Sequence, residues 1–67
     1  MFKGVVKRWF DDRAFGFIVP DAGGADVFVH VNAVTGRMHL SVGERVAYNV
    51  EIDPRNGRSR AVDVAPL

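Results

Sequence analysis

Ring-bearing side chains alternate with glycine or valine in two short segments of the chain. Phe15 and Phe17 flank Gly16, and Phe28 stands two residues before His30. In an extended chain such pairs point to one face. Flat rings offer stacking surfaces for unpaired bases and nearby cations attract phosphates, so this pattern predicts binding of single-stranded nucleic acid. The residues assigned to this surface are Lys7, Trp9, Arg13, Phe15, Phe17, Phe28, His30 and Arg58.

The other residue types that could do chemistry lack the partners they would need. The chain has no cysteine, and His30 and His39 are not accompanied by a ligand set or a catalytic spacing. Asp11 and Asp12 fall where a turn is expected, and no glycine-rich phosphate loop precedes a helix. We therefore expect a binding protein and no enzyme, with no metal, no cofactor and no small-molecule substrate.

Glycine and proline interrupt the chain so often that no helical period is sustained. The intervals predict strands near residues 2–10, 15–19, 26–31, 44–52 and 58–64, separated by turn-forming residues such as Asn56 and Gly57. The longest connection runs from Asn32 to Val42. This spacing favours an all-β fold, a small five-stranded closed antiparallel barrel. A small open sandwich is the alternative.

A small barrel has one interior, and the aliphatic faces of the strands match one another better than the aromatic ones do. The residues expected inside are Gly4, Val6, Gly16, Ile18, Val27, Val29, Val46, Val50, Ile52, Val62 and Val64. Strict alternation along the first strand then places Lys7 and Trp9 on the aromatic face. In the alternative, Phe15, Phe17 and Phe28 form the core, but that would bury the polar His30 beside three rings.

Length and charge restrict the remaining possibilities. Sixty-seven residues predict a single domain over residues 1–67, and a net charge of +1 does not by itself indicate a nucleic-acid partner. Seven of the nine basic residues are arginine, which suits planar and phosphate groups. No stretch resembles a membrane span or a secretory signal, so we expect a cytoplasmic protein without membrane contact. We expect a monomer and leave a dimer open.

Two segments of the chain resemble the nucleic-acid signatures of the cold-shock domain family. They are the segments from Arg13 to Ile18 and from Val27 to Val31, and the likeness extends from Gly4 to Val64. The resemblance implies a five-stranded barrel of the oligonucleotide-binding type that binds single-stranded RNA and DNA by stacking, with little sequence preference. It also implies a role as an RNA chaperone or in the regulation of transcription or translation.

The chain departs from the family pattern at several positions. Arg8 interrupts the usual Lys-Trp-Phe, so the register of Arg8, Trp9 and Phe10 stays open, with Phe10 either a neighbour of the aromatic face or a turn residue. Ala14 replaces a glycine, which matters if the position needs a positive φ. Val31 replaces a phenylalanine and the loop after it is about two residues short, which predicts a smaller aromatic surface. Arg55, Arg58 and Arg60 either extend the cationic surface or are solvated hairpin charges. The alternative function is a protein-interaction module using the same face.

Overall fold

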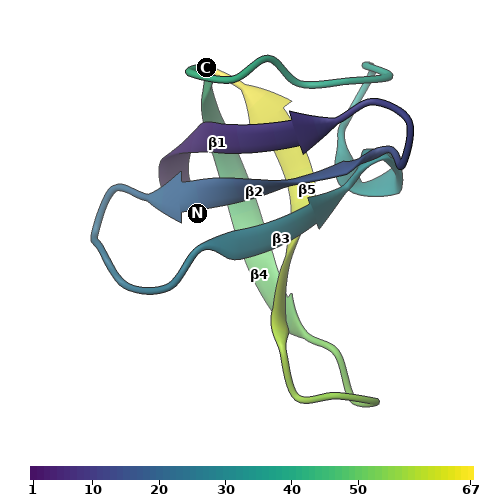
Figure 1. Ribbon diagram of the computed structural model, residues 1–67. Helices are drawn as coiled ribbons and strands as arrows, with labels where there is room; N and C mark the ends of the chain where they lie inside the picture. Colours follow the sequence, from purple (N-terminus) through teal and green to yellow (C-terminus); the bar gives the residue numbers. More distant parts are fainter.

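The computed structural model describes residues 1–67, which form five strands and one short 3-10 helix. The elements are β1 (Phe2–Phe10), β2 (Phe15–Pro20), β3 (Val27–His30), η1 (Val31–Ala33), β4 (Arg45–Ile52) and β5 (Ser59–Pro66). The strands close into a barrel in the order β1, β2, β3, β5, β4 (Figure 1). The closed barrel is confirmed over the open sandwich, and the strand bounds differ from the predicted ones by at most two residues.

Strands β3 and β5 pair in parallel and close the barrel, whereas the other four pairs of neighbouring strands are antiparallel. Phe28 of β3 pairs with Arg60 of β5. The contact continues beyond β3 through a parallel bridge between Val34 and Val64, and the Thr35 amide donates to the Val64 carbonyl at 2.8 Å. This junction brings β3, η1 and β5 together on one side of the barrel (Figure 1).

The core is aliphatic, with one tyrosine and no phenylalanine. Its most deeply buried side chains are Val6, Ile18, Val29, Leu40, Val46, Tyr48 and Val64. Desolvation in this core, together with the charge of Asp21, raises the pKa of Tyr48. The expectation that the branched aliphatic residues fill the interior and leave the phenylalanines outside is confirmed, and the phenylalanine core is excluded.

Two positions expected inside lie elsewhere. Ile52 is 59% exposed, because the β4–β5 hairpin extends beyond the body of the barrel (Figure 1). Val62 is half-buried, while Ala61 and Val64 are both buried. Asp63 between them has a φ of +53°, and this left-handed residue breaks the alternation of β5.

The loop between η1 and β4 is held by Glu44. Its carboxylate accepts from the Arg37 guanidinium and, at 3.1 Å, from the Ser41 amide. These hydrogen bonds lower the pKa of Glu44.

The chain forms no helix with the length and hydropathy needed to cross a membrane.

Candidate nucleic-acid interface

Strand β1 contains a β-bulge at Lys7. Val6 is paired with Ile18 of β2, but the next paired residue of β1 is Arg8, which lies opposite Phe17. A bulge adds one unpaired residue to a strand, and a shift of one residue moves the following side chains to the other face. Residues after Lys7 therefore point opposite to the direction that strict alternation predicts.

Trp9 is the residue most affected by the bulge. It lies opposite Gly16 and packs against the hydrophobic core. A Cβ at Gly16 would be 2.2 Å from the Arg8 carbonyl oxygen and 2.7 Å from the Trp9 ring, so this position requires glycine. The indole Nε1 is buried without a hydrogen-bond partner. The prediction that Trp9 shares the aromatic face is wrong, because the bulge turns its side chain toward the inner side of the sheet.

The outer surface of β1, β2 and β3 carries four half-buried rings in mutual contact, which we call the ring cluster: Phe10, Phe15, Phe17 and Phe28. Phe15 is the centre, with ring centroids 5.1 Å from Phe10, 5.5 Å from Phe28 and 6.0 Å from Phe17. Phe17 and Phe28 are direct cross-strand partners, 6.0 Å apart. The three predicted phenylalanines are brought together, and the bulge adds Phe10 to them.

A groove of about 810 Å³ separates the ring cluster from the β4–β5 hairpin. We call it the hairpin groove; Phe17, Phe28 and His30 line it on one side and Arg58 is among the hairpin residues on the other. Asp53 at the base of the hairpin accepts from the Arg55 amide at 2.8 Å, and this bond lowers the pKa of Asp53. The groove thus joins flat rings to a hairpin rich in arginine.

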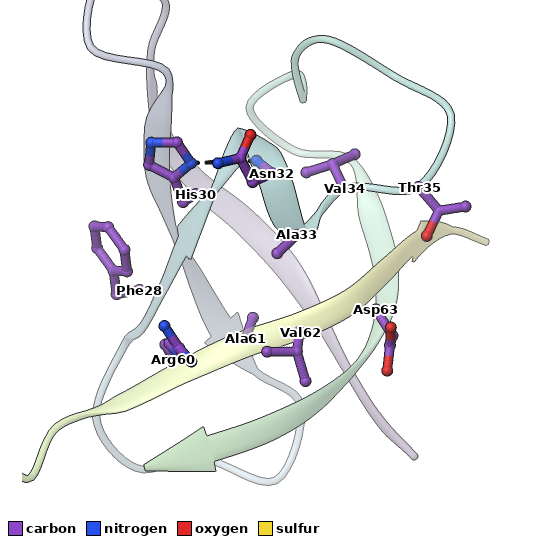
Figure 2. A pocket seen from close by; sticks show the side chains of 10 residues that line it. All are labelled: Phe28, His30, Asn32, Ala33, Val34, Thr35, Arg60, Ala61, Val62 and Asp63. Carbon is purple, nitrogen blue, oxygen red and sulfur yellow. Dashed lines mark hydrogen bonds between the residues drawn. The ribbon is translucent and has the colours of Figure 1, made fainter. Parts of the chain in front are cut away.

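A second hollow of about 510 Å³ continues from the first, between β3, η1 and β5 (Figure 2). Phe28, His30 and Arg60 line both hollows. The His30 ring is exposed, and its Nδ1 accepts from the Asn32 amide at 3.2 Å. Figure 2 shows Phe28, His30 and Arg60 along one end of this hollow. These three residues form a common border across the parallel β3–β5 junction.

The cations around the ring cluster differ in whether a carboxylate neutralises them. Lys7 at the bulge has its Nζ 3.2 Å from Asp26, and Arg60 lies 3.3 Å from Glu51. The exposed cations near the rings that form no ion pair are Arg8, Arg13 and Arg58. Arg13 lies in the turn between β1 and β2 and lines neither the hairpin groove nor the second hollow.

Sequence reasoning left four residues of this surface unassigned. Arg8 and Phe10 reach it through the bulge, which no residue type at Lys7 signals. Arg60 reaches it by pairing with Phe28, and the alternating apolar pattern of β5 gave no reason to choose it over its hairpin neighbours. Asp26 could have been found, since it precedes Phe28 by two residues and so shares its face.

The closed five-stranded barrel with rings and arginines on one outer face defines a domain of the oligonucleotide-binding type. The family described as the "Cold-shock" DNA-binding domain matches residues 2–67. The chain belongs to this family.

The relatives of the chain include proteins of different length. It is 45% identical over 63 residues to cold shock protein CspA of Rhizobium meliloti, a match that covers 91% of each chain. It is 47% identical over 64 residues to glycine-rich protein 2 of Nicotiana sylvestris, which covers 92% of this chain and 29% of that protein. The chain therefore spans nearly all of one relative and under a third of another.

A solved structure confirms the fold. The Drosophila Unr structure described as CSD456 superimposes with a TM-score of 0.79 at 22% sequence identity. The match covers 98% of this chain and 26% of the Unr chain.

Proposed function

We propose that the chain binds single-stranded RNA or DNA by stacking bases on the ring cluster, with low sequence specificity. The observation that carries this proposal is the contact of four half-buried phenylalanine rings on the outside of a barrel whose core is aliphatic. Full burial of one such ring would contribute about 1.5 to 3 kcal/mol. A domain of this size has little stability to spare, so rings held at the surface indicate a binding role.

The surroundings of the rings favour nucleic acid over a peptide. Around the ring cluster, three arginines are exposed and form no ion pair: Arg8, Arg13 and Arg58. His30 lines both the hairpin groove and the second hollow. Stacking does not distinguish the four bases strongly, because every base has a flat face. Binding of this kind keeps strands unpaired, which supports a role as an RNA chaperone or in the regulation of transcription or translation. One chain carries the complete ring cluster, so the proposed binding unit is a monomer, and we propose that it acts in the cytoplasm.

Fluorescence anisotropy with labelled oligonucleotides tests the proposal. A pyrimidine-rich single strand should bind more tightly than the duplex of the same sequence, because the rings cannot reach bases stacked within a helix. Equal or tighter duplex binding would contradict it. A labelled proline-rich peptide is the matched probe for the protein-interaction alternative, and a tighter complex with the peptide would favour that function instead.

A further inference from the structure

Arg8 occupies the position on β1 directly opposite Phe17. Directly opposed residues on neighbouring strands have their Cβ atoms about 4.5 to 5.5 Å apart, so the Arg8 side chain begins beside the ring cluster. Arg8 is exposed, and its guanidinium makes no side-chain hydrogen bond and no ion pair. The outer face of the sheet therefore carries an unneutralised cation immediately next to the Phe17 ring, on which a base is proposed to stack.

The neighbouring residues of β1 cannot take this role. Lys7 is engaged with Asp26, which offsets its charge, and Trp9 faces the core. Phe10 is already in contact with Phe15. Of the four consecutive residues at the bulge and beyond it, Arg8 is the one that offers an uncompensated charge to a ligand.

We propose that Arg8 binds a backbone phosphate of the strand whose bases stack on the ring cluster. This inference rests on the proposed function and specifies the chemistry of one contact within it. A guanidinium presents donors in a planar fork that fits two oxygens of one phosphate. The arginine side chain is also longer than that of phenylalanine, so its head reaches past the edge of Phe17, where the sugar-phosphate chain of a stacked nucleotide lies.

The contact has a quantitative signature in the salt dependence of binding. Each phosphate neutralised on a single strand contributes about 0.7 to the slope of log affinity against log salt. Three unpaired arginines near the rings predict a total slope of about −2. Removing the Arg8 contact should reduce the slope to about −1.4 and weaken binding about five-fold at 0.1 M salt.

Three variants test the assignment by anisotropy with the same pyrimidine-rich single strand over a series of salt concentrations. Arg8→Ala should show the reduced slope and the five-fold loss. Arg8→Lys keeps the positive charge and should retain the wild-type slope, but it should lose part of the affinity, less than the five-fold of Arg8→Ala, because lysine lacks the planar fork. Lys3→Ala is the matched control, since Lys3 is an exposed, unpaired cation on β1 about 16 Å from Arg8 along the strand, and it should leave the slope unchanged.

The outcomes separate this inference from the proposed function. If wild-type protein binds no single strand, the proposed function itself fails. If wild-type protein binds but Arg8→Ala keeps the full slope, the phosphate contact is refuted. The contact is also refuted if Arg8→Lys loses as much affinity as Arg8→Ala at an unchanged slope, because that pattern indicates stacking by the guanidinium plane. Thermal melts of each variant confirm that the protein compared is folded.

Discussion

Truncation of Phe17 tests the separation between the binding surface and the core. The Phe17 ring is half-buried and meets the rings of Phe15 and Phe28 edge-on at 6.0 Å. Phe17→Ala removes partial burial and two aromatic contacts, which together stabilise the fold by about 2 to 4 kcal/mol. A domain of this length has a total unfolding free energy of about 3 to 10 kcal/mol, so the variant should melt at a lower temperature than the wild type and still fold at low temperature.

Binding should weaken in the Phe17→Ala protein that is still folded. Loss of one base stack costs about 1 to 3 kcal/mol of binding free energy, which weakens a single-strand complex about 5- to 150-fold. Ile18 is the matched control, because it is the next residue of β2 and its side chain is 0% exposed in the core. Ile18→Ala should cost about 2 to 5 kcal/mol of stability and lower the melting temperature by roughly 10 °C or more. The fraction of it that remains folded should bind normally.

Thermal melts followed by circular dichroism, with anisotropy titrations of one pyrimidine-rich oligonucleotide below both melting temperatures, measure the two effects separately. Wild-type affinity in Phe17→Ala would show that the ring does not stack on a base. A folded Ile18→Ala that has lost binding, beside an unfolded Phe17→Ala, would show that the assignment of inner and outer faces is reversed.

Four further predictions concern single positions. The fluorescence of Trp9, which packs on the core, should change on unfolding and hardly at all on saturation with oligonucleotide; saturable quenching would contradict its placement. Ala14 has a φ of +59°, so Ala14→Gly should raise stability by about 0.5 to 1 kcal/mol, and a lower melting temperature would refute the strain. Asp26→Asn should free Lys7, steepen the salt slope by about 0.7 and tighten binding at low salt; an unchanged slope would show that Lys7 does not meet the strand. The pKa of Glu44 is lowered by its hydrogen bonds, so its stabilising contribution is complete above the ordinary value of 4.5 and is lost as pH falls through the lower pKa. Glu44→Gln should therefore reduce the acid sensitivity of unfolding, measured from melts over pH 2 to 6, and an unaltered profile would contradict the assignment.

The strands and the interior could be predicted where simple alternation holds. In β2 and β3 the aliphatic and aromatic residues alternate without interruption, and Ile18 and Val29 are buried while Phe17 and Phe28 are not. Turn-forming residues such as Gly57 marked the ends of the strands. The aromatic face could therefore be placed from the sequence, and its role in binding stays a prediction.

The prediction failed at single-residue irregularities. The bulge at Lys7 reversed the faces of Arg8 and Trp9, and the left-handed Asp63 did the same to Val62. A side-chain period of two makes every later position depend on one extra residue, and no residue type announces that extra residue. The irregularities decide which side chains of β1 lie on the outer face, so the candidate site was less predictable than the fold.

The parallel junction between β3 and β5 would couple the proposed binding of nucleic acid to the stability of the barrel. Phe28 and Arg60 pair there although they lie far apart in the chain, and such long-range closure carries a high entropic cost during folding. A nucleic-acid strand bound along the hairpin groove and the second hollow, as proposed above, would cross this junction and contact both Phe28 and Arg60, and it would thereby hold the barrel closed. A ligand that binds the closed barrel alone adds about 2.7 kcal/mol to its stability at a hundred times its dissociation constant. Amide hydrogen exchange at the β3–β5 junction should therefore become slower when nucleic acid is bound. The domain should also survive proteolysis longer as the concentration of single-stranded nucleic acid increases.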